Sequence, residues 1–276
     1  MLQKIHFIPY ILAFALLLGF SLIGCDTTSD SGDQASLSLQ FNTVSSSSST
    51  QAPSGMIHAV DDTLRISGSN GTLVISDIRF IVEDFELEKA DGECEGLPDE
   101  DDCEELESDP FFVDLPLEGE TIDLGTTPIE PGLYEELEFE TDDLEIDEEE
   151  DPEEQQQKQE LLDQVRSVFP EWPDSVSMVI VGTFVSTQGD STDFKTFAEA
   201  ELEIELEFNP PLEVIDNTIN KLVRVNINPT DWFLRPDGTV IDLSQFDFEN
   251  TGQILEFEAE IENGFKSVEV EDEEDD

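Results

Sequence analysis

The chain has 276 residues, of which 69 are Asp or Glu and only 11 are Lys or Arg, so its formal net charge is −58. Such a charge excludes nucleic-acid binding, which depends on cationic contacts to phosphate, and it repels anionic lipid surfaces. Hydrophobic residues still make up 37% of the chain, with 19 Phe among them, so a folded core can be built.

The N-terminus has the layout of a secretory signal over residues 1–24. Lys4 precedes an apolar run at residues 11–20, which is short for a bilayer span. The run leads into the tetrapeptide Leu-Ile-Gly-Cys at 22–25, which resembles the lipobox of bacterial lipoproteins. This resemblance implies cleavage before Cys25, thioether lipidation of that cysteine and N-acylation. Two or more acyl chains anchor a protein stably in a membrane.

The signal places the protein in the cell envelope, held to the membrane by its lipid. An aspartate directly after the cysteine, here Asp26, favours the inner membrane in some Gram-negative sorting systems. That rule does not hold across phyla, and we expect the outer membrane.

The excess of acid has two possible explanations. Cleavage of the signal removes one Lys and no acidic residue, which changes the net charge from −58 to −59. The acid either serves a specific cation-binding role or reflects halophilic adaptation, in which surface carboxylates keep a folded chain hydrated at high salt. The acidic residues are spread over almost every predicted element. Their spread favours the halophilic explanation, because self-repulsion of this size is tolerable only when it is screened.

Residues 25–56 have the composition of a flexible tether after the lipidated cysteine, being rich in Ser, Thr, Gly and Gln. Within this segment, Leu37, Leu39 and Phe41 alternate with polar residues, which indicates a short first strand.

The folded body is expected to begin at residue 57. Asn70-Gly71 predicts a tight hairpin turn between two strands. Residues 78–89 form a long predicted strand. Its apolar positions change from even-numbered to odd-numbered residues near residues 83–84, as they do at a β-bulge. Further strands are expected at residues 111–115, 121–124 and 133–141.

A helix is predicted over residues 153–169, after an acidic loop. Residues 194–208 alternate apolar and acidic residues and predict one long strand that Pro210-Pro211 ends. Other strands are expected at residues 177–186, 220–228 and 239–243. Residues 254–265 fit either a helix or a strand, and residues 271–276 form an acidic tail.

These elements predict an all-β, mostly antiparallel fold, a β-sandwich with one inserted helix. The expected domain spans residues 57–270, with halves at 57–141 and 174–250 on either side of the helix. The halves could be two small domains, but a shared core favours one.

Several segments together carry a family resemblance: residues 72–88, the loop 94–103, and residues 112–117, 131–134, 231–233 and 237–239. In these segments the chain resembles a group of uncharacterised bacterial envelope lipoproteins. The resemblance implies a secreted, β-rich domain, and it assigns no activity and no functional residues.

Cys94 and Cys103 remain after Cys25 is assigned to lipid, and we expect them to form a disulfide. They are an even pair in an oxidising compartment. The bridge would close a ten-residue loop, worth about 2.7 kcal/mol at most on the chain-entropy formula. A metal site would need a second pair or nearby histidines, and the sequence provides neither.

No catalytic motif is found. His58 is the one histidine left after the signal, and it lies beside the tether, where a surface position is expected. Carboxylate pairs are too common to be informative. A glycosidase built on them would also need exposed aromatic residues, whereas Trp172 and Trp232 lie in apolar contexts typical of a core. We therefore predict no catalytic residues and no cofactor.

Calcium is the one metal to consider. Asp99, Asp101, Asp102 and Glu104 crowd the loop between the two cysteines, and calcium prefers hard oxygen ligands. The loop does not fit the EF-hand pattern, so a solvated acidic loop is the favoured interpretation.

The sequence thus favours a lipid-anchored, non-catalytic binding or structural module that recognises a glycan or a protein partner. The alternatives are an envelope hydrolase and a calcium-binding surface protein. A cleft with aromatic residues and converging carboxylates would favour the hydrolase.

Overall fold

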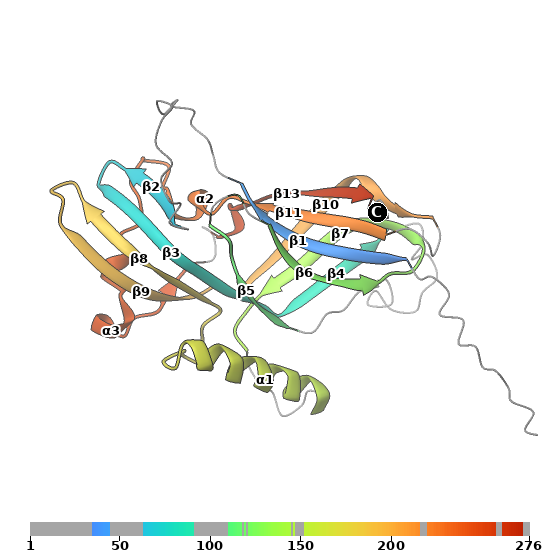
Figure 1. Ribbon diagram of the computed structural model, residues 1–276, viewed down its shortest axis with the longest axis horizontal. Coiled ribbons are helices and arrows are strands. Elements are labelled where there is room, and N and C mark those ends of the chain that lie inside the picture. Colours follow the sequence, from blue (N-terminus) through green and yellow to red (C-terminus); the bar gives the residue numbers. More distant parts are fainter. Residues whose placement is uncertain are drawn as a thin grey trace, which may run out of the picture. The chain divides into compact units, whose positions relative to one another are not determined.

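The structure is a computed structural model that describes residues 35–44, 63–90, 110–117, 119, 121–144, 146, 152–215, 220–257 and 261–272. Asp33–Asp276 form one compact unit. The described strands of this unit are arranged in three sheets (Figure 1).

Each sheet is named here by its number of strands. The four-stranded sheet has the order β13 (Phe265–Asp272), β11 (Asn220–Ile227), β1 (Ser36–Thr43) and β6 (Thr121–Pro128). The three-stranded sheet has the order β10 (Leu202–Val214), β7 (Gly132–Thr141) and β4 (Asp84–Lys89). The six-stranded sheet has the order β12 (Leu255–Glu256), β9 (Ser191–Glu199), β8 (Met178–Ser186), β3 (Gly71–Val82) and β2 (Leu64–Gly68), and β5 (Phe111–Asp114) also pairs with β3.

Most of these strands pair antiparallel, and the exceptions are β1 with β11 and β9 with β12, which are parallel. The predicted all-β, mostly antiparallel, sandwich-like fold is confirmed. The predicted hairpin is also present, with β2 and β3 in register from Leu64 opposite Ile75 to Gly68 opposite Gly71.

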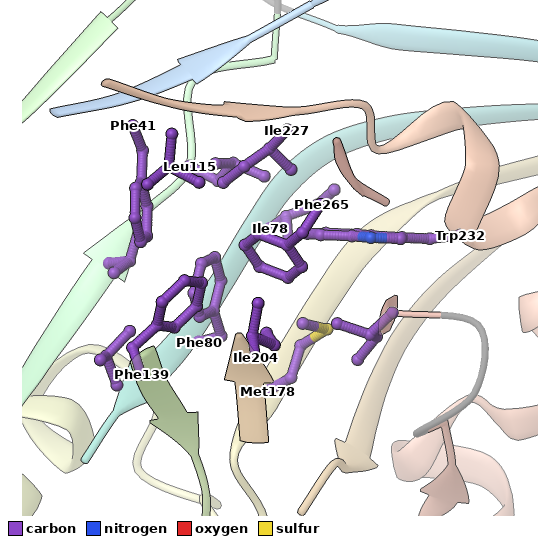
Figure 2. Close-up of a cluster of buried hydrophobic side chains, with 14 of the residues drawn as sticks. Phe41, Ile78, Phe80, Leu115, Phe139, Met178, Ile204, Ile227, Trp232 and Phe265 are labelled. Carbon is purple, nitrogen blue, oxygen red and sulfur yellow. The ribbon is translucent and has the colours of Figure 1, made fainter. Parts of the chain in front are cut away.

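The main core is built from aromatic and aliphatic side chains of all three sheets (Figure 2). Phe41 of β1 lies 6.1 Å from Phe80 of β3 and 5.6 Å from Phe139 of β7, measured between ring centroids. Phe265 of β13 lies 5.1 Å from Phe139. Trp232, which is 1% exposed, closes the cluster beside Phe80, so its predicted core position is confirmed.

The first strand belongs to this core and not to a tether. Leu37, Leu39 and Phe41 of β1 are buried, and β1 lies between β11 and β6. The short strand expected from their alternation is present. The expected start of the folded body at residue 57 is too late, because β1 already forms the interior of the four-stranded sheet.

At Glu83 the chain passes from one sheet to another. Ile78 and Phe80 are buried in β3, and Phe85 and Leu87 are buried in β4 of the three-stranded sheet. The sequence predicted a bulge in a single strand here. The change of parity instead marks a corner, the kind of bend by which strands switch sheets.

A second corner divides the predicted strand at residues 194–208. This segment forms β9 and β10, which lie in different sheets. At the break, the hydroxyl of Ser177 donates to the carbonyl of Ala200 and accepts from its N–H, both at 2.9 Å. Pro210-Pro211 do not end β10, which continues to Val214 after a register shift between Glu207 and Leu212.

The predicted helix is present as α1 (Pro152–Val168). Its buried residues, Leu161, Leu162 and Val165, join a second apolar cluster with Trp172 and Phe197. The indole of Trp172 donates to the carbonyl of Val176 at 3.1 Å. The cluster therefore covers the face of the six-stranded sheet that points away from the main core.

The remaining described elements are short. They are α2 (Thr230–Phe233), the 3-10 helix η2 (Leu243–Phe246) and α3 (Phe248–Thr251). The strand expected at residues 239–243 is reduced to a single bridge between Leu234 and Val240. The ambiguous segment 254–265 contains the two-residue strand β12 and leads into β13. Within the described residues, no helix is long and apolar enough to cross a bilayer.

Candidate binding groove and carboxylate face

The site residues predicted from the sequence fall outside the part of the chain that the structure describes. These residues are Cys25, Cys94, Cys103, Asp99, Asp101, Asp102 and Glu104, and His58 is among the undescribed residues as well. Their assignments stay predictions. Among the described residues, no set of three or more His, Cys, Asp or Glu side chains could hold a metal ion.

A groove of about 640 Å³ lies between β10 and β13. These strands form the adjoining edges of the three-stranded and four-stranded sheets, and they are in contact with each other (Figure 1). The groove is therefore an opening where the two layers of the sandwich meet.

The floor of the groove is apolar. From β10 and the residue after it come Phe208, Leu212 and Ile215, and from β13 come Val268 and Val270. Val268 and Val270 are paired with Val225 and Val223 of β11, which are fully buried, so the two valines of β13 lie on the inner face of their sheet. Ile215 is 69% exposed and Val270 is 37% exposed, which leaves an accessible apolar surface.

Local sequence accounts for this opening. Prolines cannot donate to a β ladder, and Pro210-Pro211 coincide with the register shift in β10. The register between β13 and its partner β11 also shifts, between Asn226 and Ile227 of β11. This shift bends β13 just after Phe265. Phe265 therefore points into the core, while Val268 and Val270 point into the groove.

Charged side chains surround the groove. Lys221 lies 2.6 Å from Asp272, and Arg224 lies 3.2 Å from Glu271, so both nearby cations already have acidic partners. Glu213 and Glu269 have no cation within ion-pair distance among the described residues. The rim is thus acidic, and part of its negative charge is not compensated.

The outward face of the three-stranded sheet is an array of carboxylates, called here the carboxylate face. Glu136, Glu138 and Glu140 of β7 each have acidic residues directly opposite them: Glu138, for example, lies between Glu205 and Glu86. The alternate residues of these strands, such as Leu137 and Phe139, are buried in the core. The members of the face are Glu86, Glu88, Glu136, Glu138, Glu140, Glu203, Glu205 and Glu207.

Crowding changes the protonation of this face. Burial, together with the charge of Glu203 and a hydrogen bond to it, raises the pKa of Glu138 to about 7. Two carboxyl groups can hydrogen-bond to each other only when one of them carries a proton. Burial and the charge of Glu205 likewise raise the pKa of Glu136. The face therefore holds protons at a pH at which isolated carboxylates do not.

The groove and the carboxylate face offer different chemistry. Among the described residues that line the groove there is no Ser, Cys or His, so this part of the lining holds no pairing of nucleophile and base. The carboxylates lie on one face of a sheet, and both tryptophans are buried in the two clusters. These surfaces offer apolar contact, backbone hydrogen bonding and attraction of cations, and Glu138, with its raised pKa, can also exchange a proton.

The sequence analysis missed both features. The alternation of Glu with apolar residues at 199–207 was the visible signal for one strand of the carboxylate face. Its pairing with β7 is a long-range contact that the local pattern does not contain. The groove had no signal, because Pro210-Pro211 indicated the end of a strand.

The fold places the chain among all-β proteins of sandwich-like architecture. No protein-family model and no curated protein matches the chain. Among solved structures, MbnP from Methylosinus trichosporium is similar over 70% of this chain and 76% of its own length, with 12% sequence identity and a TM-score of 0.33. A likeness at this level carries no argument about function.

Proposed function

We propose that the protein is a lipid-anchored component of the bacterial cell envelope whose β-sandwich is a non-catalytic binding module. The observation that carries the binding role is the open groove between β10 and β13, with its accessible apolar floor and acidic rim. A purely structural role would not account for an accessible apolar surface next to carboxylates that have no ion-pair partner.

The arrangement of the carboxylates supports a binding module over a hydrolase. Carboxylate-based glycosidases hold two carboxyl groups on either side of the scissile bond. Glu138 and Glu203 instead share a hydrogen bond on one face of the sheet. Aromatic residues that could stack on a sugar are also turned inward, since Trp172 and Trp232 are 4% and 1% exposed.

The anchor rests on the lipobox at residues 22–25, and the outer membrane is its proposed location. Because β1 begins at Ser36, only a short stretch connects Cys25 to the sandwich. Even fully extended, those residues would span no more than about 35–40 Å. The sandwich would therefore be held on a short connection and not on a long stalk.

Replacement of the lipidated cysteine tests the anchor. Cys25→Ser should leave the precursor unlipidated, so that both its mass and its partitioning into detergent change. Cys94→Ser is the matched control, because it removes a cysteine outside the lipobox and should keep the lipid. Unchanged mass and unchanged partitioning of the Cys25→Ser protein would contradict the proposal.

Turnover assays test the second part of the proposal. The mature chain should release no product from a panel of envelope glycans. Hydrolysis that is lost in Glu138→Gln or Glu203→Gln would show a catalytic role for the carboxylate face and would favour the hydrolase.

A further inference from the structure

Among the described strands, β13 leaves one backbone edge unpaired beside the groove. It is the last strand of the four-stranded sheet and pairs only with β11 among the described strands. An edge strand presents a row of N–H and C=O groups to any chain that approaches it. We propose that this edge accepts an extended segment of a partner protein, with apolar and cationic side chains in alternation, as an added strand. The inference rests on the proposed binding role and specifies the partner.

The backbone of β13 is suited to this pairing, and that of β10 is not. From Ser267 to Asp272, β13 contains no proline and keeps continuous register with β11. On the opposite side of the groove, Pro210 and Pro211 lack N–H groups and lie at a register shift. An incoming strand would therefore form its ladder with β13 and use β10 only as a wall.

The side chains of β13 specify the two faces of the incoming strand. Successive side chains of a strand point to opposite faces. On the groove side, Val268 and Val270 lie with Ile215 and call for apolar partners. On the other side, Glu269 has no ion pair among the described residues and calls for Lys or Arg, whereas Glu271 already pairs with Arg224. A segment with strict alternation of apolar and cationic residues satisfies both faces at once.

Charge selects a cationic partner over a second copy of this chain. If two β13 strands paired antiparallel about Val270, Glu269 of each copy would lie opposite Glu271 of the other. Like charges directly opposite each other destabilise a strand pair. The uncompensated carboxylates of Glu213 and Glu269 and the net charge of −58 act in the same direction. The acids on the edge therefore oppose self-association and attract a basic segment.

The test uses the mature chain with Cys25→Ser and the fluorescent peptide fluorescein-(Lys-Val)4-amide at about 0.15 M salt, where exposed charges are partly screened. We expect saturable binding in fluorescence anisotropy and slower amide hydrogen exchange at residues 267–272. The same peptide with every backbone nitrogen methylated keeps its charges but cannot form the ladder, and we expect it not to bind.

Protein variants locate the site. Val270→Lys places a cation in the groove at a part-exposed position and should abolish binding. Glu213→Gln with Glu269→Gln should weaken binding by about two- to fivefold, as expected for two exposed ion pairs. Glu256→Gln on β12 is the matched control for loss of one negative charge, and it should bind as the parent does.

The outcomes separate the inference from the proposed function. Equal binding of the methylated peptide, or full binding by Val270→Lys, would mean general attraction to an acidic surface and would overturn the added strand. Absence of any peptide binding, or a concentration-dependent dimer formed through β13, would also overturn it. The lipidation and turnover assays test the anchor and the absence of hydrolysis, and they do not depend on these results.

Discussion

Lys158 of α1 forms an ion pair with Glu83, the residue at which the chain passes from the six-stranded to the three-stranded sheet. The two side chains are only 16% and 17% exposed. The backbone N–H of Glu83 donates to the carbonyl of Glu140 at 2.9 Å, which extends the three-stranded sheet to the corner. Burial raises the pKa of Glu83, while the hydrogen bond and charge of Lys158 oppose that rise. The pair thus attaches the inserted helix to the corner of the sandwich.

Loss of the lysine should destabilise the fold. Lys158→Met keeps an unbranched side chain but leaves Glu83 part-buried near Asp142 and Glu140, both of which raise its pKa. We expect the free energy of unfolding in urea to fall by about 1–3 kcal/mol, between the values for exposed and buried pairs. Adding Glu83→Gln should recover part of the loss, because no uncompensated carboxylate then remains.

The same helix provides the control for that measurement. Arg166 pairs with Asp174, whose side chain is 96% exposed. Arg166→Met should therefore cost no more than about 0.5–1 kcal/mol. Equal losses for Lys158→Met and Arg166→Met would show that burial of the Glu83 pair has no energetic consequence.

Glu138 should make stability depend on pH. Its pKa is raised to about 7 in the folded state, so between its ordinary value and pH 7 the folded state binds a proton that the unfolded state has released. Stability from this group must then fall as pH rises through that window. Glu138→Gln mimics the protonated form, and it should melt higher than the parent at pH 8 and close to it at pH 4. Glu256→Gln is the control, and an equal gain in both variants would assign the effect to net charge alone.

Elements with a complete local signal were predicted correctly. The helix was expected at 153–169 and is α1 (Pro152–Val168), because its apolar stripe is contained in one segment. The Asn70-Gly71 hairpin is likewise a local feature, and β2 and β3 pair across it.

The corners between sheets could not be predicted in the same way. An alternating pattern records one buried and one exposed face, and it is the same whichever sheet a strand joins. At Ala200 the break depends on hydrogen bonds from Ser177, which lies 23 residues away in the sequence. The groove depends on β13 lying beside β10, a contact between distant segments. The lipidation, disulfide and calcium assignments lie outside the described residues and stay predictions.

Gly264 should tolerate no side chain, because it packs directly against Trp232. A Cβ at this position would lie 1.6 Å from Nε1 of the indole, far inside contact distance. Nε1 is buried without a hydrogen-bond partner in the described part of the chain, and Phe80 and Phe265 pack beside the ring (Figure 2). Gly264→Ala should therefore displace the indole and lower the free energy of unfolding by at least about 2–3 kcal/mol.

Tryptophan fluorescence and chemical denaturation measure that effect together. The emission of Trp232 should shift in Gly264→Ala, and the cost of the substitution should be smaller in a Trp232→Phe background, where Nε1 is absent. The exposed Gln253→Ala provides the control for a surface change in the same region. An unshifted spectrum with unchanged stability would show that the glycine is not required.

Salt should stabilise the whole fold. The Debye length falls from about 10 Å at 0.1 M salt to about 3 Å at 1 M. Facing carboxylates, such as those of Glu138 and Glu205, lie closer to each other than the Debye length at 0.1 M salt, so they repel each other there. The melting temperature should rise between the two concentrations and respond alike to sodium and potassium chloride, since diffuse screening does not depend on the identity of the cation. Glu205→Gln should flatten this dependence more than Glu256→Gln, because Glu205 lies within the carboxylate face.

Millimolar calcium should add nothing at saturating monovalent salt. A calcium shift that survives high salt and disappears in the Asp101→Asn, Asp102→Asn double variant would instead establish the acidic loop as a metal site. A melting temperature indifferent to monovalent salt would contradict the halophilic explanation of the charge, because the repulsion that it requires would then be absent.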